Sequence, residues 1–166
     1  RVIGADTVHE QGIFTTALPS YYALADAVAF ATNKHHLSIL NGAGSGKVVA
    51  IKKLFHINLQ LSAVTGVAVR FDVKRTTAQS GGTAITPVSM DSANPALTGV
   101  SVSTGAASVT ESSLLFPVAT QNDEISAANT AVANYLMQGL NLVLESTEMQ
   151  EIRLRAGEGL TVKQIT

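Results

Sequence analysis

The stretch VAVRFDVK, residues 67–74, is the clearest β-strand signal in this chain. Its odd positions hold three valines and a phenylalanine, and its even positions hold an alanine and three charged residues. Side chains of a β-strand alternate between two faces, so this period of two predicts a strand with one buried and one polar face.

A second alternating segment precedes this strand, between residues 49 and 61. Its odd positions are apolar and its even positions mostly polar, with Lys53 and Leu54 as the two exceptions. Residues 62–66 (SAVTG) form a short link that ends on glycine, which favours a hairpin between the two segments. Such a hairpin would set Lys52 or His56 close to Asp72 on the neighbouring strand.

Other short strand signals recur along the chain, at about residues 84–90, 100–109, 114–118, 135–144 and 152–162. Pro87 lies in the first of these, and because proline cannot donate to a strand ladder, that strand is expected at an edge or to start at Pro87. The glycines at 157 and 159 predict a turn inside the last segment. Residues 121–129 are the most polar loop, with room for one helical turn. Residues 20–32 allow either a helix capped by Ser20 or a strand from about Val28, and the strand is preferred.

These signals amount to about eight short strands with no convincing long helix. The pattern favours an all-β fold, namely an antiparallel β-sandwich of jelly-roll-like topology. Residues 1–19 show no clear period and are interpreted as an extended N-terminal arm. Residues 20–166 are then a single β-sandwich domain, in keeping with the length of 166 residues.

The composition excludes several classes of protein. Hydrophobic residues make up 46% of the chain, which excludes global disorder, and the formal charge of −1 leaves no basic excess for binding nucleic acid. The chain has no cysteine, hence no disulfide framework or thiolate site, and it has no apolar run of the roughly 20 residues that a membrane helix needs. Only 14% of residues are charged, whereas 17 are threonine and 14 are serine. Such a neutral, hydroxyl-rich surface fits an assembled or extracellular protein, and equally fits an ordinary threonine-rich β domain.

No stretch of the sequence forms a convincing catalytic, cofactor or metal site. The loop NGAGSGKV, residues 41–48, resembles a phosphate-binding loop, but it has Asn41 where such a loop needs glycine and Val48 where it needs serine or threonine. We interpret it as a tight turn. The adjacent His35 and His36 would point to opposite faces of a strand and could not share one ion. We therefore predict no catalytic, cofactor-binding or metal-ligating residue, no cofactor and no enzymatic activity.

The aromatic residues supply the only candidate site, which is an interface. Tyr21 and Tyr22 are the one adjacent aromatic pair, and Phe14 lies in the expected arm. Aromatic side chains frequently anchor interfaces, so these three residues are expected to anchor the arm against the sandwich or against a neighbouring subunit.

Three runs of the chain carry a family resemblance: residues 33–60 (NKHHLSILNGAGSGKVVAIKKLFHINLQ), 67–77 (VAVRFDVKRTT) and 153–166 (RLRAGEGLTVKQIT). Together they resemble small β-rich structural proteins of tailed-phage virions, over roughly residues 28–166. The resemblance implies a head-decoration, minor capsid or tail-associated protein that is located in the virion. It further implies a homo-oligomer, with a trimer favoured, and a major capsid or tail protein as partner. It maps no functional residue onto this chain.

Two functions are therefore expected from the sequence. The first is a non-enzymatic virion component that stabilises an assembly by burying neutral surface between copies, without direct contact with nucleic acid or membrane. The second is a binding module of the same fold that recognises a glycan or a host surface. A cupin-like enzyme is disfavoured, because it needs a cluster of histidine and glutamate that the sequence does not display.

Overall fold

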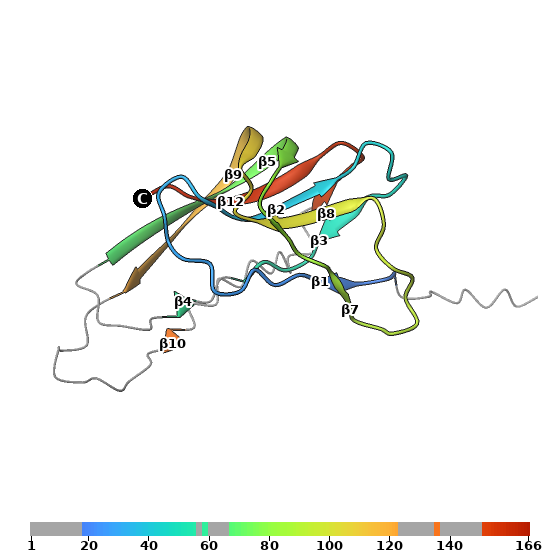
Figure 1. Cartoon of the computed structure of the whole chain (residues 1–166), viewed down its shortest axis with the longest axis horizontal. Helices are drawn as coiled ribbons and strands as arrows, with labels where there is room; N and C mark the ends of the chain where they lie inside the picture. Colours follow the sequence, from blue (N-terminus) through green and yellow to red (C-terminus); the bar gives the residue numbers. More distant parts are fainter. Residues whose placement is uncertain (1–17, 56–57, 60–66, 123–134, 137–150) are drawn as a thin grey trace, which may run out of the picture.

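The computed structural model of this chain describes residues 18–55, 58–59, 67–122, 135–136 and 151–166. Within these ranges the chain forms β-strands and no helix, and every strand pair is antiparallel (Figure 1). The all-β prediction is thus confirmed for the described part of the chain. The strands are β1 (Tyr21–Tyr22), β2 (His35–Asn41), β3 (Val49–Ile51), β4 (Asn58–Leu59), β5 (Val67–Ser80), β6 (Thr83–Ala84), β7 (Val88–Ser89), β8 (Val100–Thr104), β9 (Ser108–Asn122), β10 (Tyr135–Leu136), β11 (Ile152–Leu154) and β12 (Gly159–Gln164).

One six-stranded sheet dominates the described structure. Its strand order is β6-β8-β2-β12-β5-β9, and three two-stranded ribbons (β1–β7, β3–β11 and β4–β10) complete the pairing. The C-terminal strand β12 lies in the middle of the sheet, between β2 and β5. Strands from both ends of the sequence therefore form the centre of the fold.

The strand predicted at residues 67–74 is confirmed as part of β5, but its predicted hairpin partner is wrong. Strand β5 pairs with β9 and β12, whereas β3 pairs with β11 and β4 with β10. Accordingly, Lys52 contacts Glu151, and Asp72 accepts a hydrogen bond of 2.8 Å from Arg70. His56 and the link at residues 62–66 lie outside the described residues.

Several predicted strands have different bounds in the structure. Strand β2 begins at His35 and not at Val28, because the backbone turns at Asn33 (φ 63°) and the amide of Lys34 donates to the carbonyl of Ala31. The alternating segment at 49–61 is a strand only at β3 and β4 within its described part. The signal at 84–90 divides into β6 and β7, and β7 starts directly after Pro87. The signal at 100–109 is divided by a turn at Gly105 (φ 63°).

The apolar core lies on one face of the six-stranded sheet. Val73 of β5 and Leu160 of β12 are fully buried there, together with Leu154 of β11. The β3–β11 ribbon covers this face, since Val49, Ile51 and Ile152 pack on the same cluster. A second cluster of Val69, Phe71 and Val118 continues the core along β5 and β9.

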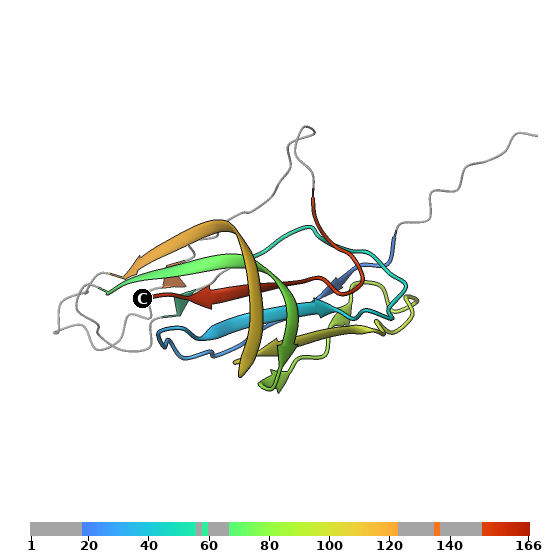
Figure 2. The same ribbon diagram turned by 90° about the horizontal axis from the view of Figure 1, so that it is seen from above.

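The opposite face of the sheet is polar although it is largely buried. A cross-strand row of Lys74, Thr161, Ser38 and Ser103 runs over β5, β12, β2 and β8. Thr161 and Ser38 have no exposed surface. They are covered because β5 and β9 bend over this face, as Figure 2 shows for the green and gold ribbons crossing β12 and β2.

The bend of the β5–β9 hairpin comes from irregular pairing. The register between the two strands shifts three times, between residues 73 and 78 of β5, and such bulges bend and twist a strand pair. Beyond the bend, the side-chain amide of Gln79 donates a hydrogen bond of 3.0 Å to the hydroxyl of Ser101 on β8. The end of β5 therefore contacts a strand three positions away in the sheet.

Strand β9 forms one edge of the sheet, and Pro117 lies in its middle. The carbonyl of Arg70 accepts a hydrogen bond from the backbone amide of Ile165, which lies on the β12 side. Backbone groups of a strand alternate in direction, so those of Asp72, two residues later, also point toward β12. Pro117 is opposite Asp72 and therefore directs its backbone away from β5. The missing N–H of this proline falls on the free edge, where it costs no ladder hydrogen bond.

Candidate functional site

The structure separates the roles of the two predicted anchor tyrosines. Both form β1, but Tyr21 is half-buried and its hydroxyl donates a hydrogen bond of 2.5 Å to the carbonyl of Pro95. Tyr22 points the other way and is 52% exposed. Tyr21 thus fastens the β1–β7 ribbon to the loop between β7 and β8, whereas Tyr22 faces the surface. Phe14 lies outside the described residues.

Tyr22 belongs to an exposed apolar face of the β1–β7 ribbon. It pairs directly with Val88, and the amide of Met90 donates to the carbonyl of Ser20. By strand alternation Tyr22, Val88 and Met90 lie on one side of the ribbon. They are 52%, 47% and 66% exposed, and Leu18 and Leu24 on the flanks of β1 are more exposed than Val88.

This face is neutral as well as apolar. Residues 18–25 and 87–90, which form the ribbon and its flanks, include no charged residue. Together with Leu18 and Leu24 on the flanks, the three side chains of this face present on the order of 500 Å² of apolar surface, in the upper part of the range for the largest patch on a monomer. Apolar patches of this size mark interaction sites more often than scattered single residues do.

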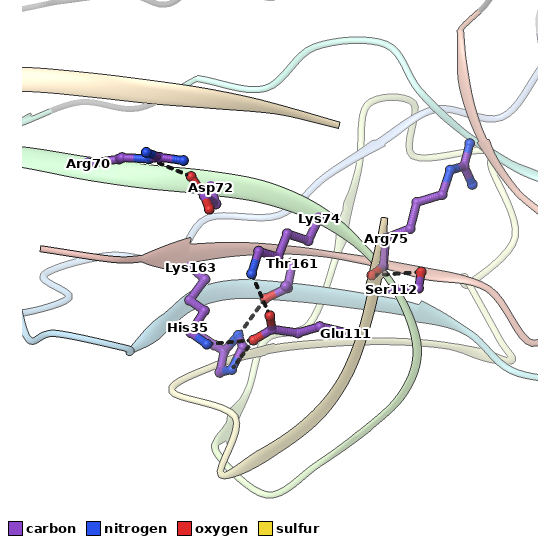
Figure 3. A network of polar contacts seen from close by, with 9 residues as sticks. All are labelled: His35, Arg70, Asp72, Lys74, Arg75, Glu111, Ser112, Thr161 and Lys163. Carbon is purple, nitrogen blue, oxygen red and sulfur yellow. Dashed lines mark hydrogen bonds and ion pairs between the residues drawn. The ribbon is translucent and has the colours of Figure 1, made fainter. Parts of the chain in front are cut away.

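A cluster of ionisable groups on the polar face of the sheet is the second candidate site (Figure 3). The Glu111 carboxylate of β9 accepts a hydrogen bond of 2.7 Å from Lys74 of β5 and another of 2.7 Å from Lys163 of β12. His35 of β2 places Nε2 3.7 Å from the same carboxylate. One carboxylate therefore joins side chains from three other strands.

The other nitrogen of His35 enters a buried network of hydroxyl groups. Nδ1 lies 3.0 Å from the hydroxyl of Thr161, which is also 2.8 Å from the hydroxyl of Ser38. The Thr161 hydroxyl also lies 3.1 Å from the carbonyl of Leu37, which can only accept. His35 therefore links this buried group of hydroxyls at Nδ1 to the Glu111 carboxylate at Nε2.

Burial and charge shift the pKa values of both ionisable partners downward. Burial lowers the pKa of His35; the Glu111 charge opposes this shift, and the charges of Lys163 and Lys74 add to it. For Glu111, burial would raise the pKa, but the hydrogen bonds and charges of Lys163 and Lys74 outweigh it and lower the pKa. At neutral pH the cluster therefore holds a carboxylate, two ammonium groups and a neutral imidazole.

This arrangement suits the joining of strands better than catalysis. Both oxygens of Glu111 are engaged by lysines, and Ser38 and Thr161 have no surface that a substrate could reach. Sequence reasoning missed the cluster altogether. His35, Lys74 and Lys163 come together only because β12 pairs with both β2 and β5, and no spacing in the sequence indicates that pairing.

The other predicted features are ordinary parts of the fold. His35 and His36 do point to opposite faces, and the second ring packs edge-on against Phe71. Residues 41–48 form a turn, as predicted. The side-chain amide of Asn41 donates one hydrogen bond to the carbonyl of Lys47 within this turn and another to the carbonyl of Leu154 on β11. Across the described ranges, no group of three or more metal-ligating side chains is close enough to hold an ion. His9 and His56 lie outside those ranges.

A shallow groove of about 320 Å³ lies beside the loop that precedes β2. Asp26 and Lys34 supply its charged groups, and the rest of its lining is small residues and backbone, with no aromatic side chain. Ala27, at its rim, adopts a left-handed backbone conformation (φ 50°) that is uncommon outside glycine.

The buried hydroxyl of Thr76 yields a first prediction. Thr76 is 1% exposed, and its hydroxyl has no hydrogen-bond partner among the described residues. Since an unpaired buried hydroxyl is costly, Thr76→Val is expected to raise the free energy of unfolding by about 1 kcal/mol. Denaturant titration measures this as a higher midpoint at an unchanged slope.

Thr161→Val is the matched control, because Thr161 is equally buried but its hydroxyl is fully engaged. We expect this variant to lose about 1–2 kcal/mol. If both variants moved stability in the same direction, hydrogen bonding would not be the cause.

The chain matches no known protein family, no curated protein and no solved structure. A search of the described residues for a helix long and apolar enough to span a membrane also finds none.

Proposed function

We propose that this chain is a non-enzymatic structural protein that self-associates through the exposed apolar face of the β1–β7 ribbon. The observation behind the proposal is the neutral, apolar surface formed by Tyr22, Val88 and Met90. A second copy is the partner that this face fits best. A face without charge meets a surface of another copy without electrostatic repulsion.

The exposed apolar face is too small to form a stable interface by itself, so the proposed interface includes further contacts. A standard protein interface buries about 800 Å² per partner, compared with the order of 500 Å² of apolar surface available here. The ribbon has only two strands, so the outer edge of β1 has no strand partner among the described residues. Strand pairing along that edge, or contacts of the arm predicted at residues 1–19, would supply the remaining area.

We further propose that the assembly is a phage virion, in which the protein decorates or stabilises the capsid or tail. This rests on the resemblance of residues 28–166 to small virion proteins and on the low charge and hydroxyl-rich composition. A jelly-roll-like β-sandwich of residues 20–166, a trimer, and contacts with a major capsid or tail protein belong to the same proposal.

Substitution of one exposed valine tests self-association. Val88→Asp is expected to shift the protein to monomer or to weaken its association at least about tenfold, because a charge would be buried at the centre of the face. Light scattering coupled to size exclusion, over a range of concentrations, measures the change.

Val48→Asp is the matched control, since Val48 is 58% exposed and lies outside the ribbon. We expect this variant to retain the oligomeric state of the unmodified chain. A chain that is monomeric before any substitution, or that dissociates equally in both variants, would refute the proposed interface.

The groove beside Lys34 favours the second candidate function, a glycan- or host-surface-binding module. The carboxylate of Asp26 could accept hydrogen bonds from a sugar, and the ammonium group of Lys34 could donate them. A glycan array with Lys34→Ala as the comparison tests this function. Binding that the variant loses, from a protein that remains monomeric, would favour the module over the assembly protein.

A further inference from the structure

One carboxylate fastens the bent end of the β5–β9 hairpin to the sheet. We call residues 76–80 and 108–111 the outer hairpin. Its charged contact with the sheet is Glu111, which accepts from Lys163 of β12 and lies beside His35 of β2. A second side-chain hydrogen bond from the outer hairpin to the sheet is neutral and runs from Gln79 to Ser101 of β8.

Protonation of His35 would add a second uncompensated positive charge to the cluster around Glu111. With a neutral ring, the carboxylate has two cations, Lys74 and Lys163. Protonation of His35 would place three cations around one anion. Asp72 of β5 is the other charged group on this face near Lys163, and it is already paired with Arg70. Gly105, which directly follows β8, donates its backbone N–H to the His35 carbonyl and adds no charge.

We propose that this cluster is an acid-responsive fastener: protonation of His35 loosens the outer hairpin from β2 and β12, and protonation of Glu111 then releases it, while the apolar core stays folded. The core is on the opposite face of the sheet, and its buried members Val73, Leu154 and Leu160 make no contact with the cluster that depends on charge. The device is independent of self-association, because the β1–β7 ribbon is not part of it.

The direction of the pH effect follows from the two shifts. The pKa of His35 is lower in the folded chain than in the unfolded chain. The unfolded or released state therefore binds more protons, and it becomes more stable relative to the folded state as the pH falls below about 6.5. Glu111 also has a lowered pKa, so its stabilising contribution is complete above the ordinary pKa of a glutamate and is lost as the pH falls from there through the lowered pKa. Both groups therefore loosen the hairpin on acidification, first His35 and then Glu111.

Hydrogen exchange of single amides tests the fastener on the whole chain. Amides of residues 76–80 and 108–111 are expected to lose about tenfold of their protection between about pH 7.5 and about pH 5, after correction for intrinsic exchange rates. Amides of β3 and β11 are expected to change less than about twofold. His35→Asn keeps a polar side chain beside Thr161 but cannot be protonated. It should therefore remove most of the change in protection between about pH 7.5 and about pH 5, a range in which Glu111 stays ionised.

Glu158→Gln is the matched control for Glu111→Gln, because Glu158 is a more exposed carboxylate whose 3.6 Å ion pair with Arg75 lies outside the cluster. We expect Glu111→Gln to leave the outer hairpin unprotected at both pH values and Glu158→Gln to behave as the unmodified chain. An identical pH response in the unmodified chain and His35→Asn would overturn the proposal, as would a loss of protection that is uniform over all strands.

A titration of the unmodified chain keeps the test decisive if a variant does not fold. The Cε1 proton of His35, followed by NMR, should titrate below the ordinary pKa of histidine, together with the amide signals of residues 108–111. A ring that titrates at or above the ordinary pKa, or independently of those amides, would also overturn the proposal.

Discussion

Phe71→Ala is expected to lower the free energy of unfolding by about 3–5 kcal/mol, which is a large fraction of the roughly 5–15 kcal/mol that stabilises a typical domain. Phe71 is 1% exposed, and it belongs to the core cluster that joins β5 to β9. Its ring also packs against two other rings, with centroids 5.1 Å from His36 and 6.1 Å from Phe30. Truncation removes these contacts and leaves a cavity that the neighbouring strands cannot close.

Thermal and urea unfolding of the purified variant measure this loss. Phe55→Ala is the matched control, because Phe55 is 58% exposed and a surface truncation should stay within about 0.5 kcal/mol. A Phe71→Ala variant that unfolds at the same urea concentration as Phe55→Ala would show that the β5–β9 core contributes little.

Gly159→Ala is expected to cost about 3 kcal/mol or to prevent folding, although it adds only one methyl group. A Cβ at this position would lie 2.5 Å from the carbonyl oxygen of Ile39 and still closer to the hydroxyl of Thr76. Gly159 begins the central strand β12, with β2 on one side and β5 on the other, so neither neighbouring backbone can move away without breaking its own pairing.

Circular dichroism and soluble yield give the first measurement for this variant, and denaturant titration gives the magnitude. Gly44→Ala is the matched control, because a Cβ at Gly44 meets nothing within 4 Å. We expect it to be neutral within about 0.5 kcal/mol. Equal stability of the two alanine variants would mean that β12 is not confined between β2 and β5.

The sequence predicted the type of structure well because alternation is a local property. The period of two at residues 67–74 and the glycines at 157 and 159 led to a strand and a turn that the structure contains. The opposite orientations of His35 and His36 also follow from alternation alone.

The pairing of strands was not predictable in the same way, and the hairpin expected between residues 49–61 and 67–74 is wrong. Proximity in sequence suggested it, but Val49 and Ile51 find an apolar partner in Leu154 and Ile152 of β11, about a hundred residues later in the chain. Many strand pairs satisfy the same alternation, and the choice between them depends on how all apolar faces pack together.

The two candidate sites show the same division. Tyr21 and Tyr22 were identified from the sequence as an aromatic pair suited to an interface, but only the register of β1 against β7 turns Tyr22 outward beside Val88. Glu111 had no sequence signal at all. Its position next to Lys163 and His35 requires the bulges that bend β5 and β9 across the sheet.

The sequence by itself therefore determined the all-β class, the neutral surface and the strand-forming segments, because composition and a period of two act over a few residues. The tertiary structure alone decided the strand order, the apolar face of the β1–β7 ribbon and the cluster around Glu111. These features join residues as far apart as Tyr22 and Val88, or His35 and Lys163. Their contacts form only when the whole chain has closed around one core, and short-range patterns contain no information about that closure.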